Sequence, residues 1–217
     1  MDSDSLLAAF EPHLQKMQAT DGWLTDAEGL ALFMTAASIK TEAPVVVEVG
    51  SFVGKSAICL AAGLAYTNPA GRLYCVDPFD STPQQMYLDR NDGSIYQRFL
   101  RNTAGYPNII SVPGLSIDIA RESDIPSEID MVFIDGDHTY QAVKNDILAW
   151  TAFLGPDGIL ALHDVELPPD TNPDVIRVVA DLGIGSPRLG WKNSVHINTL
   201  FITKRTEALW ATLTSSQ

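Results

Sequence analysis

The sequence has few cysteines, and it has no apolar run long enough to cross a membrane. Its two cysteines, Cys59 and Cys75, have no cysteine neighbour in the chain, so we expect buried thiols in a reducing compartment rather than a disulfide. No apolar run reaches the roughly 20 residues that span a bilayer. The acidic start of the chain lacks the basic region of a signal peptide. We therefore expect a cytoplasmic protein that binds no membrane.

Positive charge is also scarce. The 217 residues include 14 Lys and Arg against 27 Asp and Glu, which gives a formal net charge of -13. Proteins that bind nucleic acids usually present a cationic surface that displaces counterions from the phosphates. The sequence therefore disfavours nucleic acid as a partner and favours a small molecule. It leaves open whether the chain forms a homo-oligomer.

Linkers, repeats and low-complexity segments are lacking as well. A chain of this length with 46% hydrophobic residues can bury one large core, so we expect a single α/β domain over residues 1–217. Apolar residues at helical spacing predict an N-terminal helical cap, 1–40, in front of a core over 45–203. The second helix of the cap is expected to begin after Thr25, with Trp23 packing just before it.

Two phosphate-binding motifs are incomplete. A P-loop has four residues between its first glycine and the Gly-Lys-Ser/Thr triplet. Here only three residues separate Gly50 from the triplet that begins at Gly54. The dinucleotide fingerprint needs a second glycine where Phe52 stands. Neither motif is satisfied, although a P-loop-like nucleotide hydrolase stays an alternative.

This stretch still has the order strand, glycine turn, helix. Val45 to Val49 is a β-branched run that predicts a buried strand, and the apolar run after Gly54 predicts a helix. Glu48 lies just before the turn, and a carboxylate beside a helix N-terminus suits a ligand with an amine or sulfonium charge better than a diphosphate. A turn that binds no ligand is the competing interpretation. The residues expected to contact a cofactor here are Glu48, Gly50, Ser51, Gly54 and Ser56.

Another acidic residue ends the next predicted strand, which runs from Arg72 to Asp77. A carboxylate at that place can accept hydrogen bonds from both hydroxyl groups of a ribose. Asp77 is therefore the expected ribose contact, and a solvated acid at a strand end is the alternative. The long polar segment from Pro78 to Arg101 predicts a lid or binding loop.

Aspartates and histidines follow two further predicted strands. Asp135 and His138 come after the apolar run Met131 to Ile134, and His163 and Asp164 come after Ile159 to Leu162. Neighbouring strands lie about 4.8 Å apart, so the two aspartates can share one divalent cation. The third ligand is expected to be His163 or Glu166. His138 is the expected general base, because an imidazole accepts a proton near neutral pH. Capping of the following segments is the alternative role of the aspartates.

These motifs resemble those of a known family. The stretch from Glu48 to Ser56 resembles motif I of class I S-adenosylmethionine (SAM) methyltransferases, close to that of the catechol O-methyltransferase group. The block from Asp135 to Tyr140 resembles one found in macrolide-sugar O-methyltransferases and cephalosporin-hydroxylase-like proteins. The resemblance implies that Asp135 binds Mg²⁺ and contacts the cofactor, and that His138 is the base. It also implies that the adenine lies against Gly114 and Ser116.

The sequence departs from these patterns at three positions. His163 stands where the macrolide-sugar enzymes have an acid just before the second aspartate. Val165 stands where the catechol-type enzymes have an amide metal ligand, which leaves the third ligand open. Ile117 stands where a polar residue commonly follows the serine that lines the adenine, so one adenine contact is expected to be apolar.

Seven runs of the chain fit strands, the last two at 188–191 and 195–202 with a turn at Lys192 to Ser194. The resemblance implies a Rossmann-like α/β fold, with a seven-stranded, mostly parallel sheet, one antiparallel strand and helices on both faces. It implies SAM-dependent methyl transfer to a hydroxyl of a small molecule, a sugar or natural product, assisted by Mg²⁺. A SAM-binding subunit without catalysis is the remaining alternative.

Overall fold

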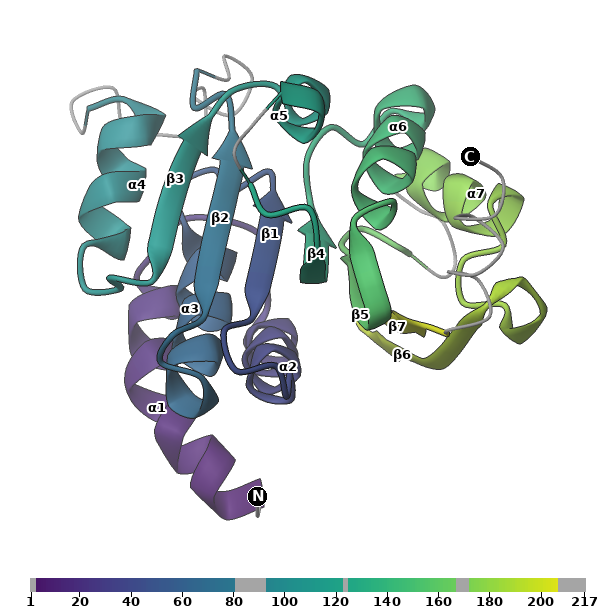
Figure 1. Ribbon diagram of the computed structural model, residues 1–217. Coiled ribbons are helices and arrows are strands. Elements are labelled where there is room, and N and C mark those ends of the chain that lie inside the picture. The colour runs from purple at the N-terminus through teal and green to yellow at the C-terminus, as the bar shows by residue number, and fades with distance from the viewer. Residues whose placement is uncertain (1–2, 81–92, 123–124, 167–171, 207–217) are drawn as a thin grey trace.

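The computed structural model describes residues 3–80, 93–122, 125–166 and 172–206. The strands are β1 (Val45–Val49), β2 (Arg72–Asp77), β3 (Ile109–Pro113), β4 (Ile129–Ile134), β5 (Leu154–Leu162), β6 (Trp191–Ile197) and β7 (Leu200–Arg205). They form one sheet in the order β3-β2-β1-β4-β5-β7-β6 (Figure 1). β7 alone is reversed, because it pairs antiparallel with both β5 and β6. The predicted seven-stranded, mostly parallel sheet is confirmed.

Helices cover both faces of this sheet, as predicted (Figure 1). They are α1 (Ser3–Gln18), α2 (Asp26–Ala37), α3 (Lys55–Thr67), α4 (Ile95–Thr103), α5 (Ser116–Glu122), α6 (Tyr140–Thr151) and α7 (Pro173–Asp181). On one face α1 to α4 build an apolar core around Phe33, Leu60 and Phe99. On the other face α5 to α7 build a second core that includes Ile147 and Val178.

The N-terminal helices form part of the first layer. Residues of α1 and α2 pack with those of α3 in the same core, so these helices lie on the sheet. α2 begins as predicted: the Thr25 hydroxyl accepts the Glu28 backbone N–H, and the Glu28 carboxylate accepts the Thr25 N–H at 2.9 Å. This capping box satisfies N–H groups that the first turn of a helix leaves without partners.

Three predicted boundaries were wrong. The turn of the last hairpin lies at Asn198 and Thr199, because Ile197 pairs with Leu200, and the segment 192–194 is an irregularity inside β6. β5 begins at Leu154, before the predicted run Ile159 to Leu162, and residues 155–158 interrupt its pairing with β4. Residues 95–101 of the predicted loop belong to α4. Residues 81–92 of that loop lie outside the described residues.

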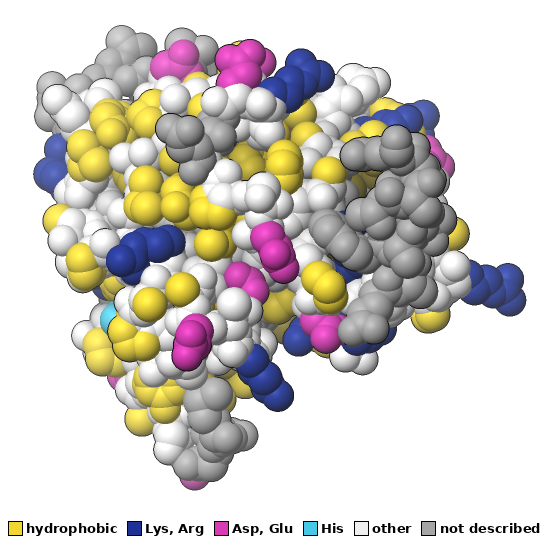
Figure 2. Space-filling model, viewed as in Figure 1, with side chains coloured by type: hydrophobic (Ala, Val, Ile, Leu, Met, Phe, Trp, Pro, Cys, Tyr) yellow, Lys and Arg dark blue, Asp and Glu magenta, His cyan; other side chains and the backbone are white. Residues whose placement is uncertain are grey.

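The surface agrees with the low content of basic residues. On the face shown in Figure 2, the described Lys and Arg side chains stand apart and form no broad basic patch. In the described part of the chain, no helix has both the length and the apolar character needed to cross a membrane.

Candidate active site

A cleft of about 1130 Å³ lies at the carboxyl ends of the parallel strands, where open α/β sheets bind their ligands. The exits of β1, β2, β4 and β5, the start of α5 and the segment Asp21–Thr25 line it. The predicted site residues that line the cleft are Gly50, Ser51, Ser56, Asp77, Ser116, Asp135, His138, His163, Asp164 and Glu166. Glu48, Gly54 and Gly114 do not line it.

Glu48 lies beneath the glycine turn and is fully buried. Its Oε2 accepts the Ser51 hydroxyl at 2.6 Å, whereas its Oε1 has no hydrogen-bond partner. Burial raises the pKa of Glu48 to about 7, because desolvation disfavours the charged carboxylate. The Glu48 carboxyl group therefore does not face the cleft. It orients the hydroxyl of Ser51, which lines the cleft.

The glycine turn is shaped by the protein around it. A Cβ at Gly50 would lie 2.1 Å from the carbonyl oxygen of Asp135, and a Cβ at Gly54 would lie 2.8 Å from the Thr103 side chain. Both glycines also have positive φ, which glycine adopts without strain. The turn can thus pack against the exit of β4, and this brings the ends of β1 and β4 together in one cleft.

Asp77 is held in place by the turn beside it. Its Oδ2 accepts the Phe52 N–H at 2.9 Å and its Oδ1 accepts the Phe79 N–H at 2.6 Å. Burial raises the pKa of Asp77, although these two hydrogen bonds oppose the shift. Phe52 and Phe79 both have positive φ, a backbone conformation that costs a non-glycine residue about 1–3 kcal/mol. Both strained residues donate a backbone N–H to Asp77, so the strain lies beside the carboxylate that faces the cleft.

Ser116 uses its hydroxyl within the protein. The hydroxyl donates to Asp146 Oδ1 at 2.6 Å and accepts from the Trp150 indole at 2.8 Å. Asp146 is buried on α6 and lines the same part of the cleft. The wall expected to bind adenine therefore combines α5 and α6.

Asp135, His138 and Asp164 converge at the exits of β4 and β5. Their potential ligand atoms all lie within 4.8 Å of one another, so the three could hold one cation. His138 Nε2 lies 3.0 Å from Asp164 Oδ2 and 3.8 Å from Asp135 Oδ1. Both carboxylates raise the pKa of His138, to about 10, against the opposing effect of burial. Asp164 has a φ of 58°, a conformation that aspartate tolerates better than most residues.

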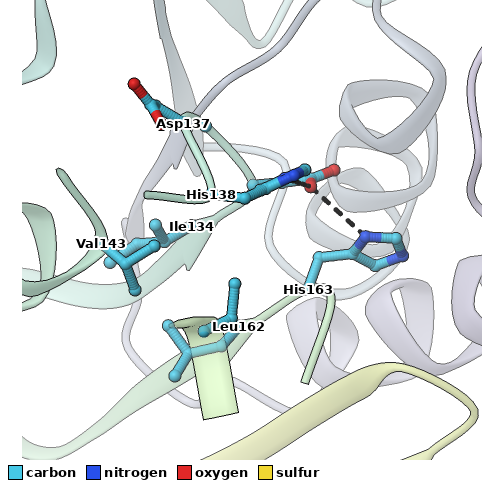
Figure 3. Close-up of a pocket in the computed structure, with 9 residues that line it drawn as sticks. Ile134, Asp137, His138, Val143, Leu162 and His163 are labelled. Atoms are coloured by element: carbon cyan, nitrogen blue, oxygen red, sulfur yellow. Dashed lines mark ion pairs between the residues drawn. The ribbon is translucent and has the colours of Figure 1, made fainter. Parts of the chain in front are cut away.

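His163 lies on the inner side of this cluster. Its Nδ1 is 3.3 Å from Asp135 Oδ1 and 3.2 Å from Asp164 Oδ2, and its Nε2 is 3.6 Å from Glu28 Oε2. Figure 3 shows the contact between His163 and Asp135, with Asp137 turned away from it. Burial opposes protonation, but the carboxylates on both sides raise the pKa of His163 to about 12. His163 thus lies between Glu28 on one side and the two aspartates on the other.

Glu28 is one of the residues at this site that the sequence did not indicate, and Asp146 is another. Burial alone would raise the pKa of Glu28, but the ion pair with His163 and the hydrogen bonds from Thr25 and Thr199 outweigh that effect and lower the pKa to about 2. The capping pattern placed Glu28 at the start of α2, and nothing in it pointed to β5. Trp23 was expected to pack as a staple, but its side chain is 64% exposed at the cleft and lies 5.9 Å from the Phe52 ring.

Comparison with known proteins finds a matching family model and curated relatives. A model of the methyltransferase domain family matches residues 47–165, more than half of the chain. An uncharacterized protein of Acanthamoeba polyphaga mimivirus is 29% identical over 145 residues, which cover 64% of this chain and 61% of that protein. The chain spans less than two thirds of the length of the curated relatives it matches.

Two solved structures share the fold. The O-methyltransferase TomG from Streptomyces achromogenes, in complex with SAM, has a TM-score of 0.62 at 18% identity, covering 95% of this chain and 91% of that chain. The O-methyltransferase from Bacillus cereus, in complex with S-adenosylhomocysteine (SAH), has a TM-score of 0.61 at 16% identity, covering 92% and 91%. At these identities the likeness establishes the arrangement of strands and helices.

Proposed function

The chain belongs to the methyltransferase domain family, and from this premise we propose that it transfers a methyl group from SAM to a hydroxyl of a small molecule. A sugar or natural-product hydroxyl is the acceptor we propose, with a divalent cation, Mg²⁺, assisting. The observation that carries the proposal is the convergence of Asp135, His138 and Asp164 in the same cleft as Asp77.

The cleft suits SAM in size and in donor chemistry. Its volume of about 1130 Å³ exceeds the roughly 300–1,000 Å³ of most ligand pockets, so a cofactor and an acceptor fit together. Each oxygen of Asp77 accepts one backbone N–H and keeps lone pairs for the two ribose hydroxyls. Ser51 and Ser56 add hydroxyl groups along the same wall.

The reaction needs positioning and removal of one proton, because SAM supplies a methyl group already activated on a sulfonium ion. A divalent cation on Asp135 and Asp164 would lower the pKa of a bound acceptor hydroxyl. His138 lies at hydrogen-bond distance from Asp164 and is partly exposed to the cleft, so it can receive the acceptor's proton.

The state of His138 favours metal assistance. The two aspartates raise the pKa of His138, to about 10, against the effect of burial, and this favours the protonated imidazole, which cannot accept a further proton. A positive charge shared by Asp135 and Asp164 would offset their pull on His138 and lower its pKa. His138 also lies inside the three-residue cluster, so a ligand role competes with the role of base.

A methyl-transfer assay tests the proposal. The protein is incubated with methyl-labelled SAM and a panel of hydroxylated sugars and natural products, with Mg²⁺ or with EDTA. We expect labelled product, less of it with EDTA, and SAH affinity that EDTA leaves unchanged. His138→Gln should lower turnover about 100-fold or more. Unchanged cation affinity in that variant would assign His138 as the base, and lost affinity would assign it as a ligand.

The outcome that contradicts the proposal is equally definite. If calorimetry detects no binding of SAM or SAH but detects ATP, the chain is a nucleotide-binding protein and the proposed function fails.

A further inference from the structure

The proposed reaction leaves the lysine of the cleft without a role. Lys55 belongs to the incomplete phosphate motif, and in the structure it is the first residue of α3 and lines the cleft. Among the described residues around the cleft it is the only Lys or Arg, while aspartates and glutamates are numerous there. A cation in such an acidic setting would be expected to pair with one of these carboxylates.

Lys55 makes a different contact. Its Nζ donates to the carbonyl oxygen of Gly22 at 3.2 Å. No ion pair within 4.0 Å joins it to a carboxylate in the described ranges of the chain. A Cβ on Gly22, whose φ is +137°, would lie 3.1 Å from the Lys55 side chain, so the segment Asp21–Thr25 crosses closely over the lysine stem. The ammonium group has three donors, so it retains donors for a ligand.

The position of Lys55 along the cleft indicates which part of a ligand it meets. The turn that precedes it contacts both ends of the candidate site, because Phe52 binds Asp77 and Gly50 packs against the backbone of Asp135. A cofactor with its ribose at Asp77 and its sulfur facing Asp135 would extend its methionyl chain along this turn. Lys55 stands at the end of the turn, where the first N–H groups of the 13-residue helix α3 also favour negative charge.

We propose that Lys55 binds the carboxylate of the methionyl group of SAM, which deepens the proposed function and rests on it. SAM carries a sulfonium and an ammonium group, both of which an acidic cleft attracts. Its carboxylate is the one group that the cleft would repel, and Lys55 supplies the matching charge. Lys55, the lysine of the incomplete phosphate motif, thus favours a cofactor that carries an amino-acid carboxylate.

The test compares two ligands and two substitutions by calorimetry. SAM and decarboxylated SAM differ only in the carboxylate, so their affinity ratio isolates that group. We expect the wild-type protein to favour SAM by about 10- to 100-fold, the range for a hydrogen bond to a charged group. Lys55→Met should reduce this ratio to near one with little change in affinity for decarboxylated SAM, which shows that the variant is folded. Lys55→Arg, which keeps the charge, should retain most of the preference.

Other outcomes overturn the inference and can be told apart. A Lys55→Met variant that keeps the wild-type ratio, or that loses the same factor for both ligands, excludes a contact with the carboxylate while leaving the proposed function intact. A wild-type protein that binds neither ligand removes the proposed function and the inference together. ATP binding that disappears in Lys55→Met would assign the lysine to phosphate.

Discussion

The carboxylates of the cleft are fixed by partners within the protein. Asp77 is held by two backbone N–H groups, and Asp135 and Asp164 are held by His138 and His163. Side chains that are oriented before a ligand arrives lose little entropy on binding. Each carboxylate can therefore be assigned to one proposed ligand: Asp77 to the ribose, and Asp135 and Asp164 to the cation. Substituting one of these residues should weaken the binding of its own ligand and leave the other unchanged.

Asp77→Ala should weaken SAH binding by about 10- to 100-fold, because it removes the acceptor for both ribose hydroxyls. Isothermal titration calorimetry measures this change, and Asp118→Ala, an acid in the same cleft on the first turn of α5, is the matched control. Equal affinity for SAH in the wild-type protein and in Asp77→Ala would exclude Asp77 as the ribose contact.

Glu28→Gln should destabilise the protein in a pH-dependent way. The pKa of Glu28 falls from its ordinary 4.5 to about 2 in the folded state, so the stabilisation is complete above pH 4.5 and is lost as the pH falls towards 2. A shift of this size corresponds to roughly 3 kcal/mol at neutral pH. Urea unfolding at pH 6 and at pH 3 should show the difference between wild type and variant shrinking by roughly 2 kcal/mol. A difference that stays constant with pH would show that ionised Glu28 is not what stabilises this site.

At the scale of elements, the start of α2 joins the N-terminal layer to the last hairpin. Thr25 caps α2 and accepts the Asn198 amide at 2.9 Å, and Glu28 accepts the Thr199 N–H at 2.9 Å. The turn between β6 and β7 is therefore tied to a helix far away in the sequence. This contact keeps His163 enclosed between α2 and the carboxyl ends of the strands.

Thr25→Ala should lower the free energy of unfolding by about 1–2 kcal/mol, the usual effect of losing a helix cap. Thr25→Ser keeps the hydroxyl and should recover most of that loss. Guanidinium unfolding followed by circular dichroism measures both variants. If the serine variant were as unstable as the alanine variant, the loss would come from the threonine methyl group and not from the cap.

The elements that follow from local pattern were predictable from the sequence. β1, β2, α2 and the glycine turn all carry short-range signals, namely β-branched runs, a capping box and glycines. The last hairpin was misplaced because Asn193 and Asn198 are equally suited to positive φ, and both adopt it. Only pairing with β5 decides that the turn falls at Asn198. The contact between Glu28 and His163 could not be predicted either, since it joins residues that are brought together only by packing.

At the scale of the whole molecule, the two apolar cores share one sheet. Strands β1, β4 and β5 contribute side chains to both cores, so neither layer can lose its core without exposing the sheet to water. The net charge of -13 and the scattered basic residues on the face shown in Figure 2 favour the small-molecule ligand that we propose for the cleft at the strand ends.

Unfolding should therefore occur in a single cooperative transition. Two of the four tryptophans, Trp150 and Trp191, lie in the second core. With Trp23→Phe and Trp210→Phe in place, tryptophan fluorescence reports on that core, whereas far-UV circular dichroism reports on the helices of both layers. We expect the two signals to give the same urea midpoint. Two separated midpoints would show that the N-terminal helical layer unfolds as an independent unit.

The most direct measurement of the central claim is a crystal structure of the protein with SAH. We expect the ribose to lie on Asp77 and the sulfur to face Asp135 and Asp164 beside the glycine turn. SAH bound elsewhere, or a cleft that remains empty at saturating SAH, would contradict it.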